Sequence, residues 1–219
     1  MTAYIMPLAL ATEAFAALAP FTADAKEAST ILRGIRVSAG ALYASDRKTV
    51  ARYRSDLIKT YDGPPAEIVI PAEAIAWIVA TKRAALRNLG ARQARFIERS
   101  DHADDPYTLT VEQEGIDLTV SIVIGNKPER SQVFDALTGN FPPVERLFPD
   151  VRVDNAPMPH LSAPLLERLG KVAKQFGAET PVRLIPSETR PDAHTMLPVA
   201  FDIHGTPVDG LIQPIKVRA

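Results

Sequence analysis

The stretch spanning residues 139–149 constrains the fold of this chain more than any other. Its last eight residues hold three prolines, Pro142, Pro143 and Pro149. Because proline fixes φ and has no N–H to donate, the stretch suits neither a helix interior nor a central strand. It also holds four large apolar residues, Phe141, Val144, Leu147 and Phe148. A solvated linker has little use for such side chains, so we expect an extended connector that packs on a folded body at the seam between two units.

The composition is that of an ordinary globular protein. The chain has 219 residues, of which 46% are hydrophobic and 23% charged, enough for one large domain or two small ones. It has no cysteine, which excludes disulfides, thiolate metal sites and cysteine nucleophiles and fits a cytoplasmic protein. The apolar start over residues 4–18 is interrupted by Pro7 and Glu13 and lacks a basic leader. We therefore expect neither a signal peptide nor a membrane span.

Upstream of the connector, the first elements are predicted as strand, helix and hairpin. Residues 4–10 form a short apolar run that holds a proline, which favours an edge strand. Thr12 can cap a helix that continues to about residue 23. The hairpin has a turn at Ala39-Gly40 and two strands, over residues 31–37 and 41–53.

The next elements follow a similar order. Residues 67–70 predict a buried strand, and Pro71 begins a helix that extends to about residue 85. A tight turn at Glu114-Gly115 joins the last two of three further strands, which are predicted over residues 94–98, 107–113 and 116–124.

Downstream of the connector, the second pattern returns. A short strand begins at Val151, and Ser162 can cap a helix over residues 163–176 that ends at Gly177. Three strands follow, over residues 181–186, 196–203 and 208–217. The topology therefore repeats although the sequence letters do not, and it predicts an α+β fold of repeated strand-helix-strands units with a half unit at the end.

Four short motifs resemble the bacterial sliding clamp, the beta subunit of DNA polymerase III. They are Ala44-Ser45-Asp46, Ile68-Val69-Ile70-Pro71, the connector from Asn140 to Pro149, and Gly210-Leu211-Ile212-Gln213-Pro214-Ile215-Lys216. Their order and separations match the family along nearly the whole chain. The resemblance implies a DNA-clamp-like fold, with helices on one face of antiparallel sheets and about one and a half clamp domains. Residues 1–149 resemble the middle domain, and residues 150–219 the second half of the third.

The chain departs from that family in two ways. The family has three domains per chain and closes as a dimer into a six-domain ring, whereas this chain would lack the first domain and half of the third. Arg47-Lys48-Thr49 also replaces the glycine-containing turn that usually follows the aspartate. A shortened clamp of this kind suits a phage or mobile element, and its orphan half domain exposes a sheet edge that predicts self-association into a homo-oligomer.

The resemblance implies a peptide-binding pocket at the seam, with walls from the hairpin, the connector and the C-terminal strand. The implied residues are Ser45, Arg47, Thr49, Val50, Pro142, Arg146, Leu147, Leu211, Gln213, Pro214, Ile215 and Lys216. In the family this pocket takes a short peptide with glutamine and large apolar side chains. The alternative is that these residues only hold the two units together.

Basic side chains gather on the two later helices. The helix over residues 163–176 has an apolar stripe and, on its other side, Arg168, Lys171 and Lys174. A second cluster, Lys82, Arg83 and Arg87, lies near the end of the helix that begins at Pro71. In the resembling family, helices line the hole and meet duplex DNA without reading its sequence. The alternative is that any solvated helix face carries lysine and arginine, and the net charge of -1 gives no general preference for nucleic acid.

An enzyme is the less favoured class. The sequence has no glycine-rich phosphate loop, His-Glu-x-x-His or Gly-x-Ser-x-Gly motif, so we predict no catalytic residues, no bound metal and no cofactor. The loop around His102, at residues 101–105, is the one cluster that could hold a cation, and a solvated loop explains it more simply. Ser45 and Asp46 fit a turn in which Asp46 accepts hydrogen bonds from nearby backbone amides.

The leading hypothesis is a non-enzymatic sliding-clamp-like protein. It would act as a DNA polymerase processivity factor or as a scaffold that binds short motifs of replication and repair proteins, and it would encircle duplex DNA. Within the same resemblance, the competitor is a monomeric decoy that occupies clamp partners. From a different class, the runner-up is a hydrolase or metal-dependent enzyme on an unrelated α+β fold.

Overall fold

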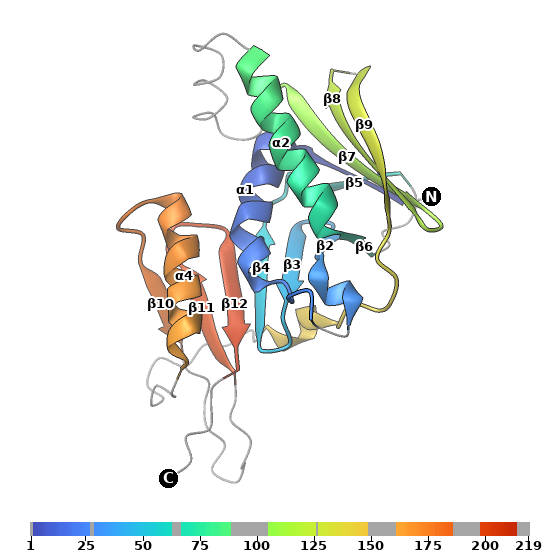
Figure 1. The fold of residues 1–219 in the computed structure, drawn as a ribbon. Helices are drawn as coiled ribbons and strands as arrows, with labels where there is room; N and C mark the ends of the chain where they lie inside the picture. The colour runs from blue at the N-terminus through green and yellow to red at the C-terminus, as the bar shows by residue number, and fades with distance from the viewer. Residues whose placement is uncertain are drawn as a thin grey trace, which may run out of the picture.

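The computed structural model describes residues 2–26, 29–62, 67–88, 105–125, 127–148, 161–185 and 198–213. These residues form two antiparallel sheets with α-helices against them (Figure 1). The predicted α+β class is therefore confirmed. Among the described residues, no helix combines the length and the apolar character needed to cross a membrane.

The smaller sheet has five strands in the order β5-β1-β7-β8-β9. Their bounds are β1 Thr2–Pro7, β5 Lys59–Asp62, β7 Tyr107–Glu114, β8 Asp117–Ile124 and β9 Lys127–Asp135. The prediction of an edge strand at the start of the chain is wrong, because β1 lies between β5 and β7. Pro7 is tolerated there since it is the last residue of the strand. The turn at Gly115 joins β7 to β8 as predicted, whereas β5 and β9 have no predicted counterpart.

The first helix, α1 (Leu8–Leu18), begins four residues before the predicted cap. The Thr12 hydroxyl does not cap it but donates within the helix, to the carbonyls of Leu8 (3.1 Å) and Ala9 (2.9 Å). The cap comes from far along the chain. The Asp105 carboxylate accepts from the N–H of Ala9 at 2.6 Å, which satisfies an unpaired donor of the first helical turn. Asp105 therefore has a structural role at α1, while the rest of the predicted 101–105 cluster lies outside the described residues.

The larger sheet has seven strands in the order β10-β11-β12-β4-β3-β2-β6. Their bounds are β2 Ile35–Ser38, β3 Ala41–Ser45, β4 Thr49–Arg54, β6 Ile68–Ile70, β10 Val182–Ile185, β11 Val199–Ile203 and β12 Val208–Ile212. The single strand predicted over residues 41–53 is two strands, since the chain reverses at Asp46 and β3 pairs with β4. The start of the strand predicted over 31–37 is instead a 3-10 turn, η2 (Thr30–Arg33).

The two predicted units share this sheet. Strand β12, from the downstream part of the chain, hydrogen-bonds to β4 from the upstream part, with Leu211 opposite Val50. A division into residues 1–149 and 150–219 stays a prediction. The strands expected over residues 94–98 and at Val151 lie outside the described part of the chain.

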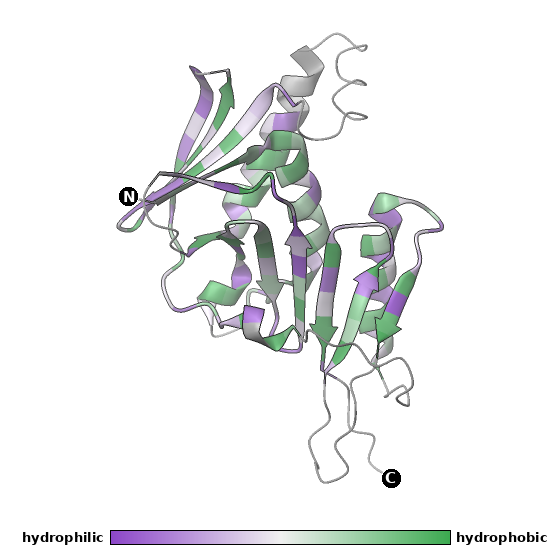
Figure 2. Cartoon of the chain, turned by 180° about the vertical axis from the view of Figure 1, so that it is seen from behind, coloured by the Kyte–Doolittle hydropathy of each residue, from purple (hydrophilic) through white to green (hydrophobic). Residues whose placement is uncertain are grey.

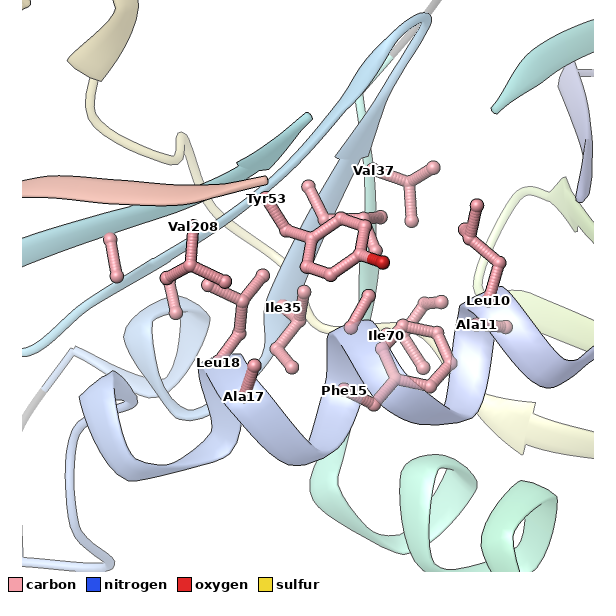
Figure 3. Close-up of a cluster of buried hydrophobic side chains, with 14 of the residues drawn as sticks. Leu10, Ala11, Phe15, Ala17, Leu18, Ile35, Val37, Tyr53, Ile70 and Val208 are labelled. Atoms are coloured by element: carbon pink, nitrogen blue, oxygen red, sulfur yellow. The ribbon is translucent and has the colours of Figure 1, made fainter. Parts of the chain in front are cut away.

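Helices α1, α2 (Ala72–Asn88) and α4 (Ala163–Phe176) lie on one face of the larger sheet (Figure 1). Helices α2 and α4 lie where the sequence predicts them. Ser162 is the N-cap residue of α4, but its side chain makes no capping hydrogen bond. Helix α1 is almost wholly buried and carries the centre of the main core. Phe15 and Leu18 point from α1 toward the strands, where Tyr53 and Ile35 meet them (Figure 3).

Candidate functional site

The larger sheet has a second face, opposite the helices, which we call the outer face; Figure 2 views the molecule from this side. Side chains alternate along each strand. Ala51 and Tyr53 belong to the helix-covered core. Val50 belongs to a separate buried cluster with Tyr43 and Val69. The side chains on the outer face therefore pack in a cluster of their own, separate from the helix-covered core.

The connector covers part of this outer face. Phe141 and Val144 are buried in the same cluster as Tyr43 and Val50, and the 3-10 turn η4 (Val144–Leu147) follows. Leu147, at the end of that turn, remains 54% exposed. This confirms the prediction that the connector packs on a folded body, and it leaves one large apolar side chain on its surface.

A buried arginine lies beneath the connector. Arg36 of β2 is 5% exposed and forms ion pairs with Glu145 of η4 and, at 3.4 Å, with Glu67. Its guanidinium carbon is 5.2 Å from the centre of the Tyr43 ring and 5.7 Å from that of Phe141, within the range of cation–π attraction. Burial, followed by the nearby Glu145 carboxylate, raises the pKa of Tyr43. Arg36 thus ties the connector to the sheet.

A second arginine spans the junction of β4 and β12. Arg52 donates two hydrogen bonds to Asp209, from Nε to Oδ1 at 2.9 Å and from Nη2 to Oδ2 at 2.6 Å. Burial opposes the charged form of Arg52, but the hydrogen bonds and charge of Asp209, together with a smaller contribution from Tyr43, outweigh it and raise the pKa of the guanidinium. This two-point geometry is the strong form of an arginine–carboxylate pair.

Phe148 covers this junction from the connector. Its ring centre is 4.0 Å from the guanidinium carbon of Arg52. The same side chain packs against the cluster that holds Val50 and against a third cluster that holds Leu211 and Ala200. One connector residue therefore bridges apolar groups from both parts of the chain.

The turn between β3 and β4 lies at one end of the junction. Asp46 Oδ1 accepts from the N–H groups of Lys48 (3.0 Å) and Thr49 (2.7 Å), as predicted from the sequence. Arg47 is held at φ 70°, a left-handed conformation that a non-glycine residue rarely adopts. The N–H of Gln213 donates to the Lys48 carbonyl at 2.8 Å, so the end of β12 lies beside the turn.

The structure brings together several of the residues implied for the pocket. Val50 pairs with Leu211 across β4 and β12 and with Ser45 across β3 and β4. Leu147 and Pro142 are exposed on the connector. Thr49 differs, because it pairs with Ile212 of the helix-covered core and its side chain lies on that face. Pro214, Ile215, Lys216 and the side chain of Arg146 lie outside the described residues.

The predicted DNA-facing cations are partly engaged with the protein itself. Arg168 Nη1 donates to Asp46 Oδ2 at 2.6 Å, and Lys171 pairs with Glu167 at 2.7 Å. Lys82 Nζ donates to the Thr12 hydroxyl at 2.8 Å, while Lys174 is exposed at the end of α4. The side chains of Arg83 and Arg87 lie outside the described residues.

Sequence reasoning missed the roles of Arg36, Arg52 and Asp209. The available signal in the sequence is that Arg36 and Arg52 each lie between apolar residues of a strand. This indicates that they lie on the face opposite those residues, but it does not identify their partners. Finding the Arg52–Asp209 pair requires the register of two strands that are 157 residues apart. Within the described ranges, no three His, Asp or Glu residues gather as a metal site, and the loop around His102 lies outside them.

Comparison with solved structures identifies the fold. The chain matches the DNA polymerase sliding clamp of Pseudomonas aeruginosa with a TM-score of 0.58 and 12% identity, over 99% of this chain and 67% of that one. A DNA polymerase III beta subunit from Eubacterium rectale matches with a TM-score of 0.60 and 9% identity, over 100% of this chain and 66% of that one. The Helicobacter pylori beta clamp bound to a DNA ligase peptide matches with a TM-score of 0.56 and 11% identity, over 99% and 66%.

These matches show that the chain has the sliding-clamp fold, as the motifs implied. It spans about two thirds of the length of those clamps. No protein-family model and no curated protein matches the sequence.

Proposed function

We propose that this clamp-fold chain is a non-enzymatic scaffold that binds short linear peptides of DNA replication and repair proteins. The binding site would lie on the outer face where β4, β12 and the connector meet. The observation that carries the proposal is the convergence at this junction of Val50, Leu211 and Phe148 from three separate segments, with the exposed Leu147 directly before Phe148 in the connector. The ligase peptide bound to the clamp of Helicobacter pylori supports it.

The junction has the physical properties that peptide capture needs. Paired strands, a proline-bearing connector and the Arg52–Asp209 pair hold its walls in place, which lowers the entropic cost of binding. An exposed leucine offers an anchoring contact for a large apolar side chain. The prolines cannot donate hydrogen bonds, so affinity would come mainly from apolar burial and from the remaining backbone groups of the connector.

Two modes of action fit the proposal. In the first, copies of the chain associate, act as a DNA polymerase processivity factor and encircle duplex DNA, with α2 and α4 toward the phosphates. In the second, a monomer acts as a decoy for clamp partners. Light scattering separates them: self-association at micromolar concentration supports the first, and a stable monomer excludes the ring. Salt-sensitive duplex binding that Lys171→Gln and Lys174→Gln weaken would support the DNA-facing assignment.

The test of the peptide site is Leu147→Ala. Removal of a buried anchor contact costs about 2 kcal/mol, so the affinity for a clamp-motif peptide should fall by about 30-fold. Fluorescence anisotropy with a labelled peptide measures the affinity, and thermal denaturation should give an unchanged Tm because Leu147 is 54% exposed. Ile116→Ala is the matched control, since Ile116 is 69% exposed in a turn of the smaller sheet. If the native chain binds no such peptide at near-millimolar concentration, the proposal is wrong.

A further inference from the structure

We infer that the downstream unit, which consists of α4 with β10, β11 and β12, docks on the same unit of a second copy of the chain. The contact surface is the flank of α4 that holds Leu166 and Gly170, together with the outer edge of β10. The inference goes beyond the proposed peptide binding and does not depend on it. It assigns a surface to the self-association that the sequence predicts.

The upstream part of the chain shows what covers a unit of this kind. It has two units in which a helix is followed by three consecutively paired strands: α1 with β2, β3 and β4, and α2 with β7, β8 and β9. The first strand after α1, β2, pairs with β6, which precedes α2. The first described strand after α2, β7, pairs with β1, which precedes α1. The two helices also contact each other, so each upstream unit covers the other.

The downstream unit has the same order of elements without such a partner in the described chain. Strand β10 is at the end of the larger sheet and pairs only with β11 among the described strands. The connector ends at Pro149 and α4 begins at Ala163, an interval too short for another helix and three strands. A second copy offers a unit with these elements, and a twofold axis lets each copy cover the other.

Helix α4 has two flanks in different surroundings. Gln175 Nε2 donates to the Ala16 carbonyl of α1 at 3.3 Å, so this flank faces α1. Helical periodicity places Leu166 and Gly170 on the opposite flank, at the end of the larger sheet that is farther from α2 (Figure 1). Leu166 is 45% exposed, and a Cβ built on Gly170 would meet no atom within 4 Å. This flank is therefore open within one copy.

The glycine is better explained by two copies than by one. Glycine destabilises a helix interior relative to alanine, and the open space around Gly170 does not require it. A residue without a side chain does allow another backbone to approach closely. Two α4 helices that cross at Gly170 can therefore pack tightly, with Leu166 of each copy against the other helix.

The charges beside this flank are complementary across a twofold axis. In an antiparallel pair that crosses at Gly170, Glu167 of one copy lies beside Lys174 of the other, because they are three residues before and four residues after the glycine. Both side chains are exposed. Glu167 also pairs with Lys171 of its own helix at 2.7 Å, and a carboxylate can accept from a second cation. Each copy supplies both charges, which favours a second copy as the partner.

The first experiment is Gly170→Glu. The variant should fold with an unchanged or higher Tm, because the new Cβ has open space and glutamate forms helices better than glycine. It places two carboxylates at the axis of the pair. The dissociation constant for self-association, measured by light scattering over a dilution series of the full chain, should therefore rise by at least about 30-fold. Ile116→Glu adds the same charge at a residue that is 69% exposed in the smaller sheet, and it should leave association unchanged.

The second experiment uses the absence of cysteine from the chain. A disulfide requires Cα atoms within about 7 Å of each other, and two helices that cross at Gly170 bring these positions close together. Mild oxidation of Gly170→Cys should therefore give a covalent dimer on non-reducing electrophoresis, whereas Ile116→Cys should not. Glu167→Lys should weaken association by about two- to tenfold, and adding Lys174→Glu to the same chain should restore it.

The outcomes separate this inference from the proposed function. A native chain that stays monomeric at micromolar concentration, an association that Gly170→Glu leaves unchanged, or Gly170→Cys that forms no covalent dimer overturns the inference. None of these results affects peptide binding, and Gly170→Glu should bind a labelled clamp-motif peptide as tightly as the native chain does. Failure of the native chain to bind any such peptide overturns the proposed function and leaves this inference standing.

Discussion

The two faces of the seven-stranded sheet are stabilised by different kinds of interaction. The helix-covered face packs against α1 in one large apolar core, with Phe15 and Leu42 fully buried. The outer face has two small apolar clusters and two buried or half-buried arginines, Arg36 and Arg52, each paired with carboxylates. Burial of apolar surface stabilises the helix-covered face, whereas ion pairs and cation–π contacts hold the connector on the outer face.

The difference follows from what covers each face. A helix satisfies its own backbone hydrogen bonds and presents a continuous apolar surface. A connector with Pro142 and Pro143 cannot do so, and it covers only part of the sheet. Ionic and aromatic contacts then hold it in place, and Leu147 is left exposed. The helix-covered face should therefore contribute most to stability, and the outer face is where we propose that peptides bind.

The largest expected effect comes from matched phenylalanine truncations on the two faces. Phe15→Ala leaves a cavity in the helix-covered core and should lower the free energy of unfolding by about 3–5 kcal/mol. Phe148→Ala removes a half-buried ring that rests on Arg52 and should cost only about 1–2 kcal/mol. Urea denaturation measures both. Equal losses would contradict the contrast between the faces.

The second prediction concerns the ion pair at the junction. Asp209→Ala leaves the guanidinium of Arg52 without its main partner in a half-buried site and should cost about 3 kcal/mol. Replacing both residues, as Arg52→Met/Asp209→Leu, should restore most of that stability, because the desolvation cost of the charges disappears as well. If the double variant is as unstable as Asp209→Ala, the ion pair itself contributes net stability to the junction. The loss in Asp209→Ala would then not be due only to the unpaired charge that it leaves.

Much of the fold could be predicted from the sequence, where a local pattern suffices. The apolar stripe and the flanking Ser162 and Gly177 correctly predict where α4 begins and ends. The start of α1 could not be found in this way, since its cap comes from Asp105, 96 residues from the amide of Ala9 that it bonds. The exposed strand β9 has little apolar alternation, so its pairing with β8 left no clear local signal.

The candidate site could be predicted only in outline. The prolines of the connector and the apolar residues between them indicated a packed seam, which the burial of Phe141 confirms. The orientation of Thr49 could not be derived, because residues 41–53 are predicted as a single strand, and the observed reversal at Asp46 changes which residues face the core. Ion pairs such as Arg52–Asp209 depend on strand order across the whole sheet, which no local pattern contains.

A smaller effect is expected from Tyr53, whose hydroxyl is one of the polar groups in the helix-covered core. Its hydroxyl donates to Glu13 Oε1 at 2.6 Å, and burial, followed by Glu13, raises the pKa of Tyr53 far above its usual value. A raised pKa in the folded state stabilises the protein below the unfolded pKa of about 10, and this contribution is lost as the pH rises further. Tyr53→Phe should cost about 1.5 kcal/mol at neutral pH.

The pH dependence of unfolding separates this hydrogen bond from simple packing. Above about pH 10, the native chain should lose stability more steeply than Tyr53→Phe, because the variant has one fewer phenol to ionise on unfolding. A residual decline is expected in both, since burial also raises the pKa values of Tyr4, Tyr43 and Tyr107. Parallel declines in the two proteins would contradict the role given to Tyr53.

The smallest effect, and the sharpest test of which face a residue occupies, is Thr49→Val. Thr49 is 1% exposed, and among the described residues its hydroxyl has no hydrogen-bond partner. Removing an unsatisfied buried hydroxyl should raise the free energy of unfolding by up to about 1 kcal/mol. Because the side chain lies on the helix-covered face, peptide affinity should not change, whereas Val50→Thr on the outer face should weaken it. A loss of stability in Thr49→Val would mean that a buried water satisfies the hydroxyl, and a loss of peptide affinity would return Thr49 to the wall of the pocket.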